Sequence, residues 1–131
     1  MVKKGTLCII LLIILLFLVT FLQIYTDNFL SSIKNKIDKI EISIENNSEQ
    51  VDNNETSSLV LDLKNYWEEK IPYICLMMNY NDIAPIGEAI SRLEAGIEAN
   101  DYISSNIETK QISRITGALQ KIFNFRLPNL L

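Results

Sequence analysis

The chain has 131 residues, with 12 basic and 16 acidic side chains and no histidine. This length allows one modest domain, and the net charge of −4 opposes binding to the phosphate backbone of nucleic acids. A chain without histidine lacks the usual general base near neutral pH and the commonest metal ligand. We therefore expect no catalytic, cofactor-binding or metal site, and we do not expect an enzyme.

Residues 7–25, called here the apolar segment, carry no charge and only two polar side chains, Thr20 and Gln23. At a helical rise of about 1.5 Å per residue, the segment would span roughly 28 Å, the hydrocarbon thickness of a bilayer. Fifteen of its nineteen residues are Leu, Ile, Val or Phe, which together favour insertion by several kcal/mol. The sequence predicts a cytoplasmic tail over residues 1–6, a transmembrane helix over 7–25, and a polar domain over 26–131.

The end of the apolar segment favours an uncleaved anchor over a signal peptide. A signal peptide would have a shorter apolar core and a small-residue cleavage site, but no Ala-x-Ala pattern follows Tyr25. Lys3 and Lys4 precede the segment and Asp27 follows it, although three lysines between residues 34 and 39 are also within range. The short basic leader favours a cytoplasmic N-terminus and an extracytoplasmic domain.

A regular apolar stripe follows the segment. Leu30, Ile33, Ile37, Ile40 and Ile44 recur every three or four residues, which is typical of the buried face of a helix. Because no Gly or Pro separates this stripe from the apolar segment, we expect both to form one long helical rod. The Asn-rich residues 45–56 predict a loop.

A second stripe predicts a helix that begins at Thr56 or Ser57 and runs to about Met78, with Pro72 kinking or splitting it. Its apolar positions include Val60, Leu63, Trp67, Ile71 or Ile74, and Met78.

Two more helices are predicted beyond residue 80. The third is expected to be capped by Asn81 or Asp82 and to end near Ala99, and the fourth follows a turn at residues 100–101. The tail from Arg126 is expected to be irregular. The apolar positions of the third are Ile83, Ile86, Ile90, Leu93 and Ile97, and those of the fourth are Ile103, Ile107, Ile112, Ile115, Leu119, Ile122 and Phe123.

The stripes also show a faint internal repeat, which chance similarity between amphipathic helices could produce as well. Residues 37–45 match residues 90–98 at an offset of 53, and residues 60–71 match residues 112–123 at an offset of 52. The predicted fold is all-α: an N-terminal transmembrane helix followed by an antiparallel bundle of about four helices. The bundle is expected to consist of two helical hairpins stacked like a short helical repeat.

Three aromatic residues are the candidate partner-binding residues. Trp67, the single Trp of the chain, is interpreted either as a core anchor or as a binding hot spot, and Tyr66 and Phe125 join it as candidates. Cys75 is expected to be a small buried side chain. A pocket between the hairpins near Trp67, Cys75 and Met78 would instead indicate a small-molecule-sensing domain.

Several segments carry a resemblance to a known family: the Lys-flanked apolar segment, Trp67-Glu68-Glu69-Lys70, residues 82–83, residues 89–94, and residues 119–123. With these features the chain resembles small single-pass membrane proteins of unknown function from Gram-positive anaerobic bacteria. The resemblance implies a helical ectodomain at the bacterial plasma membrane and is compatible with association with a larger integral membrane protein. It implies no activity.

The sequence thus favours a membrane-anchored, non-enzymatic interaction module. We expect it to bind another membrane or envelope protein, because tethering raises the effective concentration of both partners. No cofactor and no nucleic acid are expected as ligands.

Overall fold

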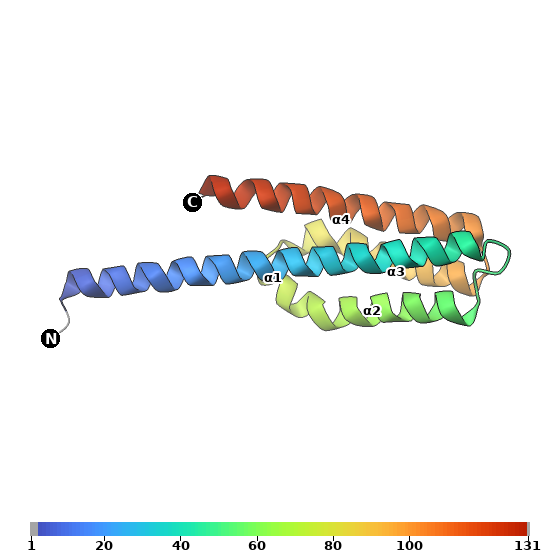
Figure 1. The fold of residues 1–131 in the computed structure, drawn as a ribbon, viewed down its shortest axis with the longest axis horizontal. Helices are drawn as coiled ribbons and strands as arrows, with labels where there is room; N and C mark the ends of the chain where they lie inside the picture. Colours follow the sequence, from blue (N-terminus) through green and yellow to red (C-terminus); the bar gives the residue numbers. More distant parts are fainter. Residues whose placement is uncertain (1–2, 131) are drawn as a thin grey trace.

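The structure, a computed structural model, describes residues 3–130, with side chains described through residue 123. Four α-helices and no strand lie within this part of the chain. They are α1 (Lys4–Asn46), α2 (Asn54–Ile74), α3 (Tyr80–Glu98) and α4 (Tyr102–Leu130). The all-α prediction is confirmed, and the apolar segment and the first stripe form one continuous helix that extends well beyond the other three (Figure 1).

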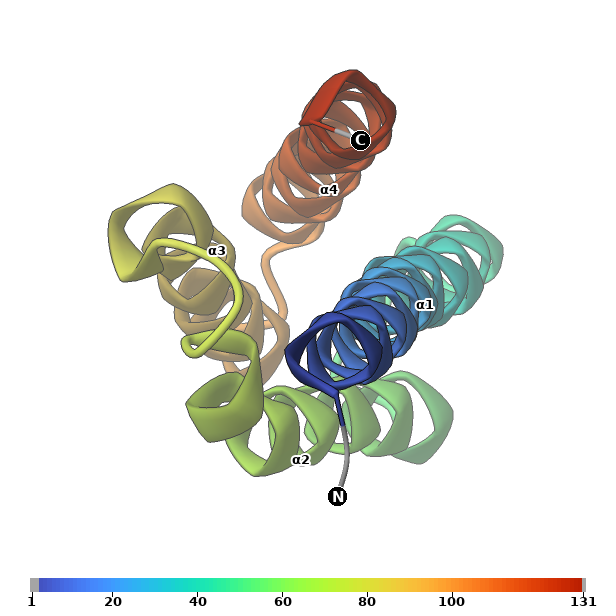
Figure 2. The same ribbon diagram turned by 90° about the vertical axis from the view of Figure 1, so that its left-hand side faces the viewer.

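The four helices form an antiparallel bundle. Each helix packs against the next one in the chain, and α4 returns to pack against α1. Viewed end-on, the helices occupy four corners around a common core (Figure 2). The hairpins α1–α2 and α3–α4 therefore close into one bundle, as the stripes predict.

The core begins where the apolar segment ends. Thr26 is the first buried residue of α1, and residues 7–18 are exposed along their whole length. Among the described residues, α1 alone is long and apolar enough to cross a membrane. The predicted stripes of α1, α2 and α3 supply most of the core, whose largest fully buried side chains are Phe29, Leu30, Ile33, Ile37, Ile40, Ile44, Leu63, Ile74, Ile83, Ile86, Ile90 and Leu93.

The N-terminal caps of α2 and α3 differ from the predicted ones. Asn53 caps α2 by accepting a hydrogen bond from the backbone N–H of Thr56 at 2.9 Å, so the helix begins before Thr56. Asn79 caps α3 by accepting from the backbone N–H of Asn81 at 3.0 Å. In both cases the cap is an Asn that lies two or more residues before the predicted cap. Asn is well suited to this position, because its side-chain oxygen accepts a hydrogen bond from a free N–H group of the first turn.

The C-terminal end of α2 also departs from the prediction. The helix continues two residues past Pro72 and ends at Ile74, so Pro72 lies in its last turn instead of splitting a longer helix. Cys75, predicted to be buried, is exposed. The reason is that Ile74 takes the last buried position of α2, and Cys75 begins the connection to α3.

The fourth helix buries only part of its predicted stripe: Ile112 and Leu119 are buried as predicted, whereas the positions near its N-terminus are not. Ile103 and Ile107 are 70% and 59% exposed. The α3 and α4 backbones approach closely, since a Cβ added at Gly96 would lie 2.8 Å from Ser105 Oγ, and this spacing admits only small side chains. The buried face of α4 is Ser105, Thr109, Ile112, Thr116 and Leu119.

The C-terminal tail is helical instead of irregular. Gln120 Nε2 donates a hydrogen bond to Ser31 Oγ at 3.2 Å, which aligns α4 with α1, and α4 then continues to Leu130. No Gly interrupts the sequence after residue 117, so no helix-ending residue precedes Pro128.

Asn100 joins two connections at the end of the bundle away from the apolar segment. Its φ of 52° lies in the left-handed region, which Asn tolerates better than most residues. The backbone N–H of Asp101 donates to Gly96 O at 2.8 Å and that of Asn100 to Ile97 O at 3.0 Å, which ends α3 in a Schellman motif. Asn100 Oδ1 also accepts from the backbone N–H of Val51 at 2.8 Å. One residue therefore both ends α3 and fixes the α1–α2 connection.

We expect Asn100→Ala to lower the free energy of unfolding by about 1–3 kcal/mol, because Ala is strained at this φ and the Val51 N–H loses its partner. Asn100→Gly should cost less, since it removes the hydrogen bond and keeps the backbone unstrained. Denaturant unfolding followed by circular dichroism measures both effects. Equal stability of the Ala variant and the unchanged chain would contradict this role.

Candidate interaction site

Two adjacent hollows form an open groove between α2 and α3. The hollow nearer the α1–α2 connection has a volume of about 330 Å³, and the one nearer the apolar segment has a volume of about 310 Å³. Lys64 lines both hollows. The first is lined by Ser57, Val60, Leu61, Lys64, Glu94, Ile97 and Glu98, and the second by Lys64, Trp67, Glu68, Ile71, Tyr80, Ala84, Gly87, Glu88, Ile90 and Ser91.

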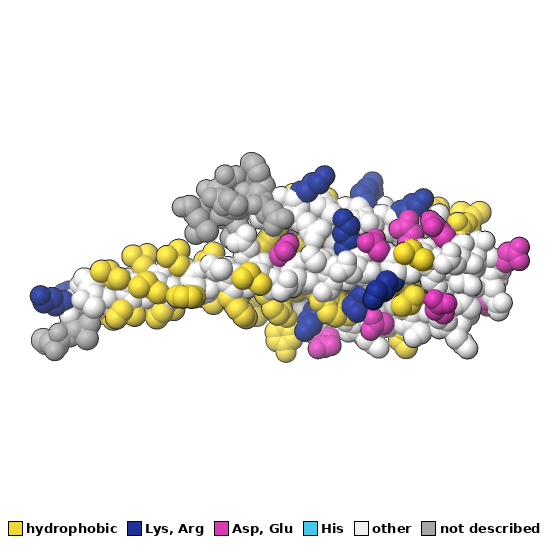
Figure 3. Space-filling view, in the orientation of Figure 1, with side chains coloured by type: hydrophobic (Ala, Val, Ile, Leu, Met, Phe, Trp, Pro, Cys, Tyr) yellow, Lys and Arg dark blue, Asp and Glu magenta, His cyan; other side chains and the backbone are white. Residues whose placement is uncertain are grey.

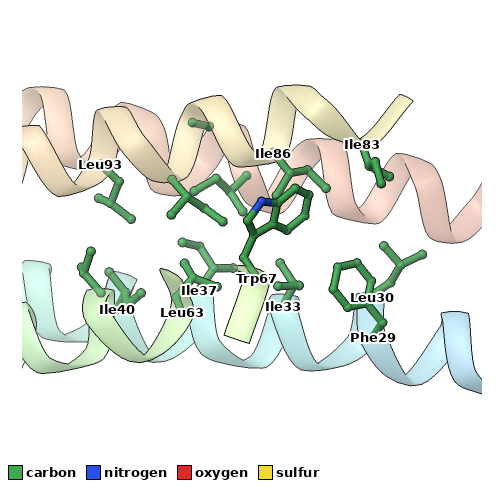
Figure 4. Packing of buried hydrophobic residues seen from close by; sticks show 14 of the residues in the cluster. Phe29, Leu30, Ile33, Ile37, Ile40, Leu63, Trp67, Ile83, Ile86 and Leu93 are labelled. Carbon is green, nitrogen blue, oxygen red and sulfur yellow. The ribbon is translucent and has the colours of Figure 1, made fainter. Parts of the chain in front are cut away.

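Trp67 forms a wall of the second hollow. It is 9% exposed, and it reaches from α2 across to α3 above Phe29, whose ring centroid lies 5.9 Å away (Figure 4). A Cβ added at Gly87 would lie 2.9 Å from Trp67 Nε1, so the missing side chain at Gly87 makes room for the indole. No described residue accepts a hydrogen bond from Nε1, which lies on the side of Gly87.

An ion pair crosses the groove. Lys64 Nζ lies 3.1 Å from Glu94 Oε1 and 3.0 Å from Oε2. The hydrogen bond to Glu94, together with the negative charge of that carboxylate, raises the pKa of Lys64 above its usual value. Lys64 is therefore charged at neutral pH, and it separates the two hollows.

The groove is acidic around an apolar floor. Its charged lining residues are one lysine and four carboxylates, Glu68, Glu88, Glu94 and Glu98, and within the described residues only Glu94 among these four forms an ion pair. Val60, Ile90 and Ile97 are buried beneath the rim. The arrangement suits an apolar segment that carries positive charges at its edges.

Tyr66 faces another side of α2 from the groove. Its ring stacks on Phe29 at a centroid distance of 5.9 Å and an interplanar angle of 15°. Lys36 Nζ lies 5.1 Å from the Tyr66 ring centroid and also forms an ion pair with Asp62 at 2.7 Å. Tyr66 and Trp67 therefore do not share one binding surface, and the side chain of Phe125 lies outside the described residues.

The predicted pocket of Trp67, Cys75 and Met78 does not correspond to this groove, because neither Cys75 nor Met78 lines either hollow. Sequence reasoning missed Gly87. It interpreted Glu88, Glu94 and Glu98 as a solvated charged face and did not place them with Glu68 around one groove. Gly87 could have been found from its place inside an amphipathic helix, because a glycine there often marks a position where another part of the chain packs closely against the helix. Within the part of the chain that the structure describes, no three Cys, Asp or Glu side chains gather in a way that could hold a metal ion.

One known protein family matches most of the chain. A family model described as a domain of unknown function, DUF4363, matches residues 20–130. The chain belongs to this family. The DUF4363 match begins inside the apolar segment and covers the remainder of α1 and the three other helices, so the groove lies wholly within the matched region. No curated protein and no solved structure matches the chain.

Proposed function

We propose that this chain is a membrane-anchored, non-enzymatic interaction module whose groove between α2 and α3 binds a segment of another membrane or envelope protein. The observation that carries the proposal is the groove itself, which combines a lining of apolar side chains, Leu61 among them exposed, with an acidic rim. The partner segment is an amphipathic helix with apolar residues on one face and Lys or Arg beside them, which is the helix-in-groove form of recognition.

The charge of the molecule supports a basic partner. Residues after the apolar segment hold 10 basic and 16 acidic side chains, a net charge of −6, and on the face of the bundle seen in Figure 3 acidic and basic side chains are interspersed. Long-range attraction of this sign speeds the encounter with a basic partner and weakens as salt is added. The apolar floor then supplies the short-range contacts.

The apolar segment supports membrane anchoring. Its residues 7–18 are exposed, and its mean hydropathy reaches 3.2 over 18 residues, whereas the buried side chains of the core all come from the bundle. Lys3 and Lys4 before the segment favour an N-terminus in the cytoplasm of a bacterial cell and a bundle outside the plasma membrane. Protease added to intact protoplasts would digest the bundle in this orientation and spare it in the opposite one.

Site-specific photo-crosslinking in native membranes tests the groove. A photoreactive residue at position 61 replaces Leu61, which lines the groove and is 54% exposed. The matched control is position 107, where Ile107 is 59% exposed on the outer side of α4. We expect a defined crosslinked product from position 61 and none from position 107.

Charge reversal of the rim makes the crosslinking test specific. Glu68→Lys combined with Glu88→Lys is expected to remove at least most of the product from position 61, because both exposed carboxylates line the groove. Circular dichroism of the variant checks that the bundle is still folded. Identical products from both positions, or a product that survives charge reversal, would exclude the groove as the binding site, and a product of twice the chain's own mass would identify a second copy as the occupant.

A further inference from the structure

The connection between α2 and α3 exposes apolar side chains at the end of the bundle from which the apolar segment emerges. Leu76 is 84% exposed, and Tyr73 and Tyr80 are 57% and 59% exposed. No charged residue occurs between Lys70 and Asp82. We call Tyr73, Leu76, Met77, Met78 and Tyr80 the apolar rim.

A direct contact sets the level of the apolar rim along α1. Thr26 Oγ1 lies 3.4 Å from Met77 Sδ, and Thr26 is the residue that follows the apolar segment. The end view shows the α2–α3 connection on the same face of the bundle as the emerging N-terminal half of α1 (Figure 2). In the space-filling view, hydrophobic side chains continue from α1 onto the adjacent end of α2 (Figure 3).

We propose that the apolar rim lies in the interfacial layer of the same bilayer that holds the apolar segment, and so gives the bundle a second contact with lipid. The inference rests on the proposed membrane anchoring. If residues 7–25 fill the hydrocarbon layer, residue 26 and the neighbouring Met77 lie at its boundary, where the interfacial layer extends several Å further on each side.

The amino-acid composition of the apolar rim fits a lipid surface better than a protein partner. Tyr side chains are enriched at membrane interfaces, where the ring lies among the headgroups and the hydroxyl reaches water. Tyr25 ends the apolar segment next to Thr26, and Tyr73 and Tyr80 are exposed on either side of the connection that contacts Thr26. The anchor holds Leu76 at this depth whether or not a protein is bound, so lipid is the occupant that is always present.

Two contacts with the bilayer would also orient the groove. A single helix in the bilayer allows the bundle to tilt and rotate, whereas a helix together with the apolar rim on the α2–α3 connection restricts both motions. Tyr80 belongs to the rim and also lines the second hollow of the groove. The groove therefore opens at the membrane surface, where a segment that leaves the bilayer can enter it directly.

The native Cys75 is the reporter for a test that leaves the rim intact, since it is exposed and adjoins Leu76. The full chain carrying Cys8→Ser is labelled at Cys75 with an environment-sensitive fluorophore and reconstituted into phosphatidylcholine–phosphatidylglycerol vesicles. Lipids brominated near the headgroup end of their acyl chains serve as quenchers. The control label is at the opposite end of the bundle, in Cys8→Ser/Ser48→Cys/Cys75→Ser, where Ser48 is exposed.

We expect brominated lipid to reduce the fluorescence at position 75 by roughly twofold, since interfacial groups lie within about 5–10 Å of the acyl boundary, and to leave position 48 unchanged. Leu76→Glu should lower the quenching at Cys75, whereas the matched exposed change Ile107→Glu should not. The quenching does not depend on which leaflet the bundle faces. Circular dichroism of each variant in the same vesicles checks that the helices are retained.

Equal, weak quenching at positions 75 and 48 would overturn the rim proposal, as would a Leu76→Glu variant that is quenched as strongly as its parent. Alkaline extraction of the same vesicles separates this result from a failure of anchoring. Chain that stays in the vesicles with position 75 unquenched refutes the rim alone, whereas chain that is extracted refutes both. The crosslinks from position 61 report on the groove independently of either measurement.

Discussion

Deleting residues 4–24 is expected to move the protein from the membrane fraction to the aqueous fraction while the bundle stays folded. The deletion removes nearly all of the apolar segment, whose insertion is worth several kcal/mol, and each 1.4 kcal/mol is about a tenfold change in partition. Among the residues whose side chains are described, the deletion removes no buried one, because the first buried residue on α1 is Thr26. Alkaline and high-salt washes of membranes, followed by circular dichroism of the released chain, measure both effects.

A pair of matched substitutions separates membrane insertion from general effects of added charge. Ile14 lies within the apolar segment and is 57% exposed, and Ile107 lies on α4 and is 59% exposed. Ile14→Arg should weaken membrane retention by about 3 kcal/mol, whereas Ile107→Arg should leave it unchanged. Full retention of the deletion variant in washed membranes would refute the anchor.

Trp67→Ala is expected to lower the free energy of unfolding by about 3–5 kcal/mol, the usual cost of truncating a buried aromatic residue. The indole fills the space between α2 and α3 above Phe29 (Figure 4), and the short side chain would leave a cavity continuous with the groove. Denaturant unfolding of the full chain in detergent micelles, followed by circular dichroism, measures the change. A loss below about 0.5 kcal/mol, the range of ordinary surface changes, would show that the indole is not part of the core.

Gly87 supplies the control for this packing. Gly87→Ala should cost about 1–3 kcal/mol through overpacking, because its Cβ would meet the rigid indole at 2.9–3.1 Å. In a Trp67→Leu background the same substitution should cost much less, since the obstacle is gone and the two effects are coupled. Equal costs of Gly87→Ala in both backgrounds would place the strain somewhere other than the Trp67 contact.

Trp67 has features of both roles considered from the sequence, a core anchor and a residue of a binding surface. The side chain is buried and contacts the core, and its remaining exposed part forms a wall of the groove. Substituting Trp67 would therefore change stability and binding together. The exposed carboxylates Glu68 and Glu88 are the better positions at which to test binding, because they lie on the groove and outside the core.

The pattern of hydroxyl side chains distinguishes α4 from the other helices. Ser105 Oγ and Thr116 Oγ1 are buried and have no hydrogen-bond partner among the described residues, whereas the buried hydroxyls of Ser43 and Thr56 pair with each other at 2.6 Å between α1 and α2. A buried polar atom without a partner costs free energy. The face of α4 that meets the bundle is therefore less stabilising than the apolar faces of α1 and α3.

Helix boundaries illustrate how local signals compete. The prediction recognised that polar residues begin α2 and α3, and the structure assigns the caps to Asn53 and Asn79. Each is preceded or followed by further Asn, Asp, Ser or Thr residues that could accept the same hydrogen bonds. Local sequence therefore limits a cap to a few positions, and the packing of the helix selects one of them.

The amino-acid sequence by itself determined the apolar segment, the helical class, and the buried faces of α1, α2 and α3. Each depends on properties that are local to one helix. The apolar segment is defined by its length and apolarity, and each buried face is defined by one continuous apolar stripe. A helix with one such stripe has a single low-energy orientation toward a core.

The sequence predicted the buried positions Ile112 and Leu119 of α4. Only the tertiary structure decided which face of the N-terminal part of α4 is buried, where the groove lies, and that the α2–α3 connection lies beside Thr26. The stripe of α4 mixes Ile, Ser and Thr, so two faces compete, and the close approach at Gly96 favours the small residues. The groove and the apolar rim each join segments that are distant in the chain. Such contacts arise from the packing of helices against one another, and no periodicity within a single helix encodes them.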